Sequence, residues 1–555
     1  MSVTQSSVLI VGAGPVGLTL AMDLAWRGID VVIVERRAAG EPPSVKCNHV
    51  AARSMEIFRR LGVADALRGA GLPADYPHDV VYRTSATGQE LTRIVIPSPV
   101  GRKAGERGPD TDWPTAEPPH RINQIFLEPI LYAHAAAMPQ IRIVNQADVE
   151  SFEQDDAGVT VRARSLAGGE PLAFFARFLI GCDGGRSLVR RQIGAGMIGD
   201  AVVQRVQSTY LRAPDLLHRM TRPLAWGNFS LNPRRCGNVY AIDGRETWLV
   251  HNYLNDDEAD FDAVDRDWAI RTILGVGSDF SYEILSKEDW FGRRLIADRF
   301  RDRRVFLCGD SAHIWVPFAG YGMNAGIADA ANLAWLLAAH LKGWGDAAVL
   351  DAYEAERLPI TEQVSHFAMN HALAVAKHRR EVPSDIEDAG AEALRRSIGA
   401  RVYELNVQQY CCAGLNFGYY YDRSPLIAYD GEPQPAYGMG TFTPSTVPGC
   451  RLPHFFLPSG RSLYDALDQD YTLLRSDRAI DVAPLRRAAA ALGFPLALLD
   501  MDPPEDMRGV FGHALYLVRP DQHIAWRGDK PPADAAVLIR RVSGRAVPPG
   551  VLAAE

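Results

Sequence analysis

The chain has 555 residues, more than one hydrophobic core usually accommodates, so two or three domains are expected. Its hydrophobic fraction of 47% is ordinary, and its formal net charge of -8 comes without a polybasic run, which argues against nucleic-acid binding. Glycines and Asp23 interrupt the apolar stretch 8–26, so neither a membrane span nor a signal peptide is expected. The 7 cysteines are scattered without a C-x-x-C pair, which favours a cytoplasmic protein without a disulfide framework or bound metal.

The N-terminal elements predict the start of a parallel α/β domain. Residues 8–11 form a short β-branched run typical of a buried strand, and 15–27 has helical periodicity ending at Gly28. A second buried strand is expected over 31–34. The order strand, glycine turn, helix, strand is that of a nucleotide-binding unit.

The glycine turn is Gly12-Ala13-Gly14-Pro15-Val16-Gly17, and Glu35 closes the next strand. The glycines allow the backbone to approach a pyrophosphate at the helix N-terminus, and Glu35 can accept hydrogen bonds from ribose hydroxyls. This fingerprint predicts a dinucleotide site without separating FAD from NAD. The similar run Gly194-Ala195-Gly196-Met197-Ile198-Gly199 follows a predicted helix at 187–192 and lacks the preceding strand, so it is not interpreted as a second site.

The remaining elements suggest lobes assembled from distant segments. Residues 97–120 are rich in proline, glycine and charge and predict a long surface insertion. A second, sheet-rich lobe is expected from the strands at 159–161, 174–180, 226–231 and 247–253. Helices are expected at 53–61, 124–137 and 324–341, and a further strand at 304–308. From about Gly438 the pattern changes to short strands and helices, which indicates a separate C-terminal domain.

Two later motifs decide the family. The first is Cys182-Asp183-Gly184-Gly185-Arg186-Ser187, and the second is Gly309-Asp310-Ser311-Ala312-His313, which is followed by Pro317, Gly320, Gly322, Met323 and Asn324. Together with the first fingerprint, they resemble the para-hydroxybenzoate hydroxylase family, the single-component (class A) FAD-dependent aromatic hydroxylases. The likeness is strongest to the phenol and hydroxybiphenyl hydroxylases, and it covers most of residues 5–370.

This resemblance implies an α/β fold in which a Rossmann-like FAD-binding domain is interleaved with a mixed-sheet substrate domain, with a thioredoxin-like C-terminal domain. The expected segments are 1–75, 121–200 and 291–400 for the FAD domain, 76–120 and 201–290 for the substrate domain, 401–437 for a linker and 438–555 for the C-terminal domain. In that domain Cys450 stands alone, so packing or homodimerisation is expected of it rather than disulfide exchange.

The resemblance also implies an FAD site. Its expected residues are Gly12, Gly14, Pro15, Val16, Gly17, Glu35, Arg36, Lys46, Arg53, Gln124, Asp183, Arg186, Gly309, Asp310, Pro317, Gly320, Gly322, Met323 and Asn324. Asp310 and Gln124 would contact the ribityl chain, and a helix starting near Gly322 would place its N–H groups at the flavin N1/O2 edge. Lys46 stands where the family usually has an arginine, and lysine loses the bidentate fork. For Arg53, an FAD contact and a surface position on a helix are both open.

The implied reaction is hydroxylation of a phenolic ring in aromatic catabolism, with NADH or NADPH and O2 as co-substrates and a flavin C4a-hydroperoxide as oxidant. The loop 315–320, including Pro317, would form a wall that excludes water. His251 and Tyr253 are candidates for removing the phenolic proton, with His49 less favoured, although a histidine that is merely packed is the commoner situation. Trp226, Trp248 and Tyr210 would be pocket or core residues, and His313 structural.

Three alternatives stay open. The same scaffold could hydroxylate a polyketide or other polycyclic aromatic compound, and sequence does not give the pocket volume that separates these substrates. A flavin dehydrogenase that never activates O2 is a second alternative. A flavin-binding protein without oxygenase activity is the third.

Overall fold

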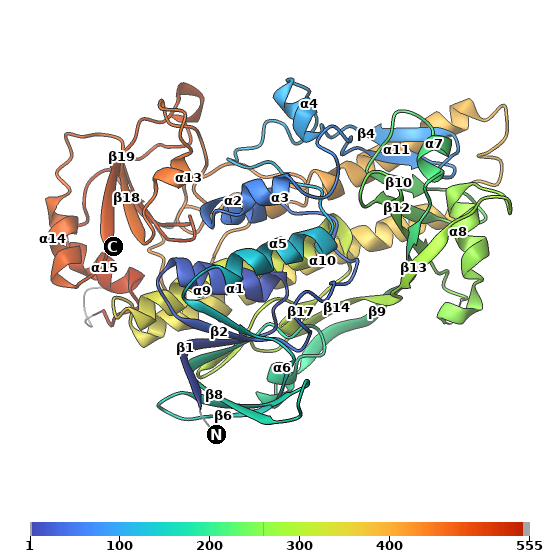
Figure 1. The fold of residues 1–555 in the computed structure, drawn as a ribbon. Coiled ribbons are helices and arrows are strands. Elements are labelled where there is room, and N and C mark those ends of the chain that lie inside the picture. Colours follow the sequence, from blue (N-terminus) through green and yellow to red (C-terminus); the bar gives the residue numbers. More distant parts are fainter. Residues whose placement is uncertain (1–2, 259, 548–555) are drawn as a thin grey trace.

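The computed structural model describes residues 3–258 and 260–547. Within these residues the strands form three main sheets, which correspond to three lobes of the molecule (Figure 1). None of the helices in this part of the chain is long and apolar enough to cross a membrane.

The first sheet carries the glycine turn. Its strand order is β15-β16-β8-β1-β2-β5, and the neighbours from β16 to β5 are parallel. The strands are β1 (Thr4–Val11), β2 (Val31–Val34), β5 (Ile141–Val144), β6 (Ala147–Gln154), β7 (Val159–Ser165), β8 (Pro171–Gly181), β15 (Arg301–Asp302) and β16 (Val305–Leu307). The helices of this lobe are α1 (Pro15–Trp26), α2 (Ala52–Arg60), α3 (Ala64–Arg68), α5 (Gln124–Ala136), α6 (Leu188–Gln192), α9 (Tyr321–Leu341) and α10 (Ala352–Arg380).

The placement of β7 and β8 corrects the interpretation of the strand pattern, which put 159–161 and 174–180 in the second lobe, although the segment 121–200 was expected in the FAD domain. β8 pairs in parallel with β1, and β7 pairs with β8 at the other end of that strand. Phe178, Leu179 and Ile180 are all buried, as expected of a central strand covered on both faces. The expectation failed because the alternation of β7 resembles a half-exposed sheet, whereas sheet membership depends on a distant partner.

The second sheet has the order β17-β14-β9-β12-β11-β10-β3-β4, with β13 beside β9. Its strands are β3 (Val80–Arg83), β4 (Glu90–Ile94), β9 (Met197–Arg212), β10 (Gly227–Ser230), β11 (Gly237–Ala241), β12 (Thr247–Tyr253), β13 (Glu283–Lys287), β14 (Trp290–Ala297) and β17 (His313–Ile314). The helices are α4 (Pro99–Lys103), α7 (Leu216–Arg219), α8 (Arg266–Leu274) and α11 (Glu392–Tyr410). The expected insertion 97–120 is irregular apart from α4.

The segment 401–437, expected to be a linker, is part of the folded body. It contains the second half of α11 and the helix α12 (Ala413–Phe417). Leu415 and Tyr421 are buried there. Helical segments with an apolar face pack against a neighbour, whereas a flexible linker lacks such a face.

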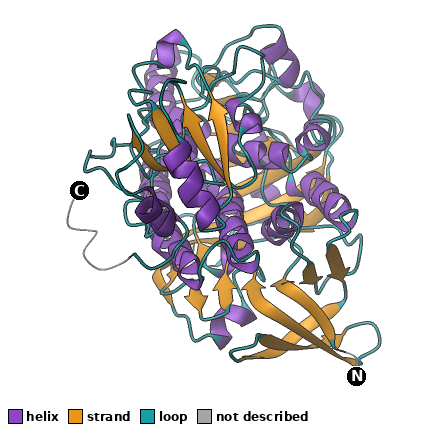
Figure 2. Ribbon diagram, turned by 90° about the vertical axis from the view of Figure 1, so that its left-hand side faces the viewer, coloured by secondary structure: helices purple, strands orange, loops and turns teal. Residues whose placement is uncertain are grey.

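The C-terminal lobe has a four-stranded sheet in the order β19-β18-β20-β21, seen nearest the viewer in Figure 2. Its elements are α13 (Leu463–Ala466), β18 (Tyr471–Arg475), α14 (Ala483–Ala491), β19 (Leu496–Asp500), β20 (Leu515–Val518), β21 (Ile524–Gly528) and α15 (Ala535–Val542). A parallel β18–β19 pair followed by an antiparallel hairpin is the arrangement of a thioredoxin-like domain. The ring of Tyr471 lies 6.1 Å from those of Trp335 and Trp344, so this lobe shares a core with α9.

Buried charges also join the C-terminal lobe to the first lobe. Arg519, which follows β20, forms ion pairs of 2.6 Å with Glu356 on α10 and 2.7 Å with Asp521. Arg451 pairs with Glu56 on α2 at 2.5 Å. We call the set Glu56, Glu356, Arg451, Arg519 and Asp521 the charged junction. Because each of these charges faces an opposite one, the junction fixes the lobe rather than leaving buried charge uncompensated.

Candidate active site

A cavity of about 1100 Å³ lies between the first and second sheets. At one end it is lined by residues that directly follow strands of the first sheet, namely Gly12 after β1, Glu35 after β2, Cys182 after β8 and Cys308 after β16. The carboxyl ends of parallel strands are where α/β sheets bind nucleotides. The other end reaches β10, β11 and β12 of the second sheet.

The glycine turn is shaped by two close approaches. Gly12 has a φ of 107°, and a Cβ there would lie 2.4 Å from the carbonyl oxygen of Cys182. A Cβ on Gly17 would lie 2.1 Å from the carbonyl oxygen of Gly12, so Gly17 packs helix against turn and does not itself line the cavity. Gly14 differs, because a Cβ there would meet no protein atom within 4 Å. This open face at the start of α1 fits a pyrophosphate, together with Pro15 and Val16, which also line the cavity.

Glu35 is buried at the edge of the cavity. It accepts hydrogen bonds from the Ala13 N–H at 2.5 Å and from the Arg37 N–H at 2.9 Å, and Arg37 pairs in turn with Glu128 at 2.6 Å. These bonds hold the carboxylate beside the glycine turn, where a ribose would lie. Arg36 lines the same edge with a mostly exposed side chain, 3.8 Å from Asp148.

Two carboxylates in the middle of the cavity retain free acceptor capacity. One oxygen of Asp183 accepts the N–H groups of Leu188 and Val189 at 2.7 and 3.1 Å, while its other oxygen is buried without a partner. Asp310 opens onto the cavity, and the surrounding protein raises the pKa of its carboxyl by desolvation. Unsatisfied carboxylate oxygens in a concave site are suited to the hydroxyl groups of a ribityl chain.

Three further expected residues lie around these carboxylates and line the cavity. Gln124 is the first residue of α5, and its side-chain amide donates to Glu128 at 2.9 Å. Lys46 pairs with Glu288 at 2.8 Å and is largely exposed, and Arg186 is exposed at the rim. Lys46 therefore lies at the opening of the cavity, where its charge pairs with Glu288 of the second lobe.

The start of α9 reaches the cavity through the loop 315–320. Gly320 adopts a φ of 62°, and Gly320, Gly322, Met323 and Pro317 all line the cavity. The first turn of α9 has no side-chain cap, so its N–H groups and the helix dipole favour negative charge at this point. The flavin edge accumulates such charge on reduction, which fits the expectation for Gly322.

Asn324, Gly309 and Arg53 do not line this cavity. Asn324 accepts the Ala51 N–H at 2.8 Å and donates to the carbonyl of His49 at 3.1 Å, so its side chain holds the neighbouring segment. A Cβ on Gly309 would lie 3.1 Å from Val16, which indicates packing against α1. Arg53 donates to the carbonyl of Asp521 at 2.6 Å, because the buried face of α2 turns toward the C-terminal lobe. Protein contacts thus account for the side chains of Asn324 and Arg53 and for the packing of Gly309.

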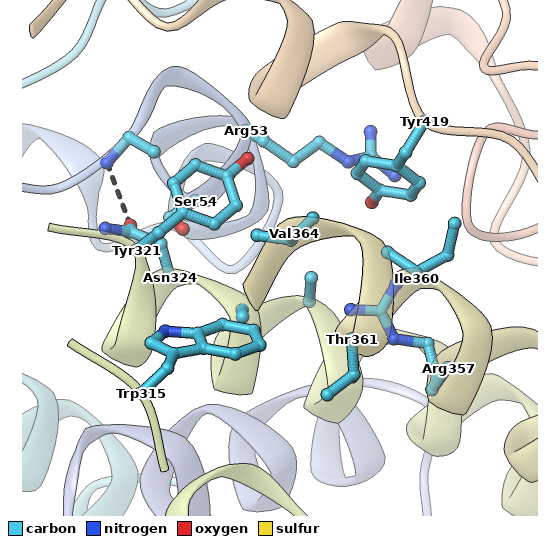
Figure 3. A pocket seen from close by; sticks show the side chains of 13 residues that line it. Arg53, Ser54, Trp315, Tyr321, Asn324, Arg357, Ile360, Thr361, Val364 and Tyr419 are labelled. Carbon is cyan, nitrogen blue, oxygen red and sulfur yellow. Dashed lines mark hydrogen bonds between the residues drawn. The ribbon is translucent and has the colours of Figure 1, made fainter. Parts of the chain in front are cut away.

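A separate void of about 10 Å³ lies behind the loop, between α2, α9 and α10 (Figure 3). Trp315, Arg357 and Thr361 point toward it, and each has a buried polar atom without a protein partner. Its volume and polarity suit one water molecule. His313 stacks on Trp315 at 4.7 Å and bonds to Asp329 at 2.7 Å, so it supports the loop from behind.

The end of the cavity at the second sheet is lined mainly by rings. We call this part the aromatic pocket, and its rings are Tyr82, Trp226, Phe229, Tyr240, His251, Tyr253, Trp290 and Tyr410. The rings contact one another, with centroids of Tyr82 and Phe229 at 4.8 Å and of Trp226 and Tyr240 at 5.0 Å. Offset and edge-to-face packing of this kind offers flat surfaces to another aromatic ring. Trp248 and Tyr210 are not among the lining residues.

His251 and Tyr253 face the pocket together because they are two residues apart on β12. Burial lowers the pKa of His251 to about 4, so its imidazole is neutral at pH 7 and can accept a hydrogen bond. Tyr253 accepts a hydrogen bond from Asn238 at 2.5 Å, and its ring lies 3.8 Å below the Arg379 guanidinium. Burial raises the pKa of Tyr253, so its hydroxyl stays protonated.

Arg121 was not expected in the site, although it precedes Gln124 by three positions. It is 3% exposed, its guanidinium lies 4.2 Å above the Trp226 ring, and its Nη1 is 2.6 Å from His49 Nδ1. Burial and the charge of Arg121 lower the pKa of His49 well below its usual value, so His49 is the neutral acceptor. No local sequence pattern indicates that a basic residue just before a helix contacts a tryptophan about a hundred positions further along the chain.

Comparisons with known proteins agree with this geometry. Residues 5–368 match the family model described as FAD binding domain, and 445–546 match that of the aromatic-ring hydroxylase C-terminal domain. A putative polyketide hydroxylase of Streptomyces halstedii is 31% identical, covering 96% of this chain and 94% of that protein. A phenol 2-monooxygenase of Pseudomonas sp. (strain EST1001) is 29% identical, covering 99% and 94% respectively.

A solved structure is similar over the same length. The rebeccamycin biosynthetic enzyme RebC with reduced flavin has a TM-score of 0.87 and 31% identity, covering 98% of this chain and all of that one. Both family models, the shared fold and the cavity between the two sheets support the same family assignment. The chain belongs to the FAD-dependent aromatic-ring hydroxylases, a family of flavoprotein monooxygenases.

Proposed function

We propose that this protein hydroxylates a phenolic ring held in the aromatic pocket, consuming NAD(P)H and O2. The observation that carries the proposal is the continuity of the cavity. It runs from the glycine turn past Asp310 and the start of α9 to the aromatic pocket. An aromatic substrate and the flavin ring can therefore share one continuous cavity.

The residues along this cavity fit FAD. Gly14 and Glu35 would hold the pyrophosphate and ribose, and Asp183, Asp310 and Gln124 the ribityl side. When bound, FAD carries two electrons from NAD(P)H to O2, so that one oxygen atom enters the ring and the other leaves as water. The start of α9, with Gly322 and Met323, would stabilise negative charge at the flavin edge.

The side chains of the protein have three tasks in this proposal. Pro317 and Phe318 line the cavity beside the start of α9, where they exclude water from the reacting atoms. Trp226 and Tyr240 orient the ring by stacking. His251 accepts a hydrogen bond from the ring hydroxyl and orients it, because an imidazole with a pKa of about 4 is too weak a base to hold a phenolic proton.

A polycyclic substrate, including a polyketide, is a second candidate. The rings of the pocket come from β3, the residue before β10, and β10, β11, β12, β14 and α11, so they line more surface than a single phenol covers. The similarity to the Streptomyces halstedii protein named as a putative polyketide hydroxylase supports the same substrate class. Product yield across phenols, naphthols and hydroxylated anthraquinones would rank the two candidates.

The central experiment is incubation of the FAD-loaded enzyme with NADH or NADPH, these aromatic compounds and ¹⁸O-labelled O2. We expect a substrate-stimulated oxidation of the nicotinamide and one labelled oxygen atom in the product, measured by mass spectrometry. Nicotinamide oxidation without label in any product would instead indicate a dehydrogenase. A yellow protein that no aromatic compound stimulates would indicate a flavin-binding protein without oxygenase activity.

The FAD site has its own test in Gly14→Ala. A methyl group there meets no protein atom within 4 Å, so the stability of the FAD-free protein should hardly change. It would occupy the space expected for the pyrophosphate, so we expect FAD to bind at least roughly tenfold more weakly. Equilibrium titration of the FAD-free protein measures this effect. Unchanged FAD affinity in Gly14→Ala would contradict the assignment of the glycine turn.

A further inference from the structure

Arg121 carries a buried positive charge for which the described residues provide no carboxylate partner. The acidic side chain that acts on it, Asp110, is itself bonded to Arg102 at 2.5 Å. The thiols of Cys411 and Cys412, which also act on Arg121, do not replace a carboxylate, since burial raises the pKa of both. A buried cation is costly unless a partner neutralises it, so the missing partner calls for an explanation.

Apart from Asp110, which is paired with Arg102, the groups that act on Arg121 among the described residues are neutral. Burial and the guanidinium itself lower the pKa of both His49 and His78 well below the usual value. These histidines are therefore neutral at pH 7 and do not offset the charge of Arg121. Its Nη1 meets His49, whereas Nε and Nη2 form no hydrogen bond with the described residues and are not fully buried. Because Arg121 lines the cavity, these two nitrogens can donate to a ligand there.

The position of Arg121 relates it to the place of reaction. Its guanidinium covers Trp226 of the aromatic pocket at 4.2 Å. On its other side His49 adjoins the loop 315–320, since a Cβ on Gly320 would lie only 3.1 Å from the His49 side chain. Arg121 thus stands where the aromatic pocket meets the start of α9. A ring lying against Trp226 could place an oxygen substituent on the guanidinium.

We propose that Arg121 binds an anionic oxygen of the aromatic substrate, either a carboxylate or an ionised ring hydroxyl. This inference rests on the proposed function and adds the substrate class, an acidic aromatic compound rather than a neutral one. A planar guanidinium suits both groups because its N–H donors lie in one plane and stay charged. The substrate would supply the charge that the protein leaves unpaired. An ionised hydroxyl would also make the ring more electron-rich and easier to hydroxylate.

The test uses two pairs of probes of matched shape, titrated into the FAD-loaded enzyme and followed by the absorption spectrum of the flavin. One pair is 2-naphthoate and the neutral 2-naphthamide, and the other is ionised 4-nitrophenol and neutral 4-nitroaniline at mildly alkaline pH. Arg121→Met should weaken the binding of the charged probe of each pair by roughly 10- to 100-fold and leave the binding of the neutral probe nearly unchanged. Arg121→Lys, which keeps the charge without the fork, should fall between the two.

The two charged probes separate the sources of the anion. A loss of affinity confined to 2-naphthoate would identify a carboxylate as the group that Arg121 binds. A loss of affinity confined to 4-nitrophenolate would identify an ionised hydroxyl. Arg395→Met is the matched control, because Arg395 is also a buried arginine but bonds to backbone carbonyls of Ile386 and Asp388 outside the cavity. This control should bind all four probes as the parent enzyme does. If Arg121→Met fails to fold, Arg121→Gln takes its place in the same titrations.

Equal binding of charged and neutral probes by the parent enzyme, or equal weakening of both by the variant, would overturn the inference. So would a changed FAD affinity or flavin reduction potential without any change in charge discrimination, because Arg121 would then serve the cofactor. These measurements need no turnover. Intact discrimination combined with failure to incorporate labelled oxygen would therefore refute the proposed function and leave the anion site standing.

Discussion

In the charged junction Arg519 is 1% exposed and lies between Glu356 and Asp521, whereas Arg121 is 3% exposed and, among the described residues, forms no ion pair but bonds to neutral His49 and lies over Trp226. The two arginines are almost equally buried, yet only one has its charge neutralised by the protein. Stability alone favours the first arrangement, because a buried charge without a partner is destabilising. The second is typical of a functional site that keeps free capacity for a ligand.

Breaking the junction should have the largest effect on stability. Glu356→Ala leaves Arg519 buried with Asp521 as its one remaining carboxylate, and we expect the free energy of unfolding to fall by about 3–5 kcal/mol. Chemical denaturation of the FAD-free protein measures the change. The matched control is Glu150→Ala, which removes an exposed ion pair with Arg164 and should cost less than about 1 kcal/mol. Similar losses in both variants would show that the junction does not fix the C-terminal lobe.

A fall in pH should show a second difference between the two regions, because one buried histidine near Arg121 lowers the free energy of unfolding by about 2 kcal/mol in acid. Burial lowers the pKa of His120 from 6.5 to about 4. Below pH 6.5 the unfolded chain therefore binds a proton that the folded chain rejects, and the free energy of unfolding should decrease as the pH falls toward 4. At pH 5 this amounts to about 2 kcal/mol for each such histidine.

His120→Gln should reduce this dependence, because glutamine keeps an N–H for the Leu67 carbonyl, which His120 contacts at 3.0 Å, but does not titrate. Denaturation at pH 7 and pH 5 gives the difference for parent and variant. Parallel pH profiles would mean that His120 is not neutral in the folded protein. The carboxylates of the junction provide the contrast, since Asp521 has a pKa held well below its usual range by Arg519 despite its burial.

The smallest effect is expected at the mouth of the cavity. The Lys46–Glu288 pair joins the two lobes at 2.8 Å, but Lys46 is 61% exposed. Lys46→Met should therefore change the free energy of unfolding by less than about 1 kcal/mol. Added salt should reduce this difference further. A loss as large as that of Glu356→Ala would contradict the distinction between exposed and buried pairs.

The end of the cavity beside the glycine turn could be predicted from the sequence because its parts are local. The turn at Gly12 and the helix start at Gly322 each depend on a few consecutive residues whose backbone geometry limits the side chains allowed. Glu35 follows from the length of one strand–helix–strand unit. The family resemblance then supplied Asp183 and Asp310, which both line the cavity.

The aromatic pocket could be predicted only in part. His251, Tyr253 and Trp226 were considered as pocket residues, but Tyr82 and Tyr410 were not, since they lie on β3 and α11 at opposite ends of the substrate-lobe sequence. For Arg53 the sequence left an FAD contact and a surface position both open, and the structure instead buries its side chain against the C-terminal lobe. In both cases the partner is set by long-range packing, which no local pattern records.

The long strand β9 has a mechanical consequence. Its first half pairs with β14 from Met197 opposite Ala297 to Val206 opposite Trp290, and its second half pairs with β12 of the same sheet. The paired strands β9 and β14, with one register shift between Gly292 and Arg294, thus connect α6 and β15 of the first lobe to the second sheet (Figure 1). A hinge motion between the lobes would have to break the pairing of β9 with β14. We therefore expect ligands to enter by displacement of short connections at the cavity mouth, while the lobes keep their mutual orientation.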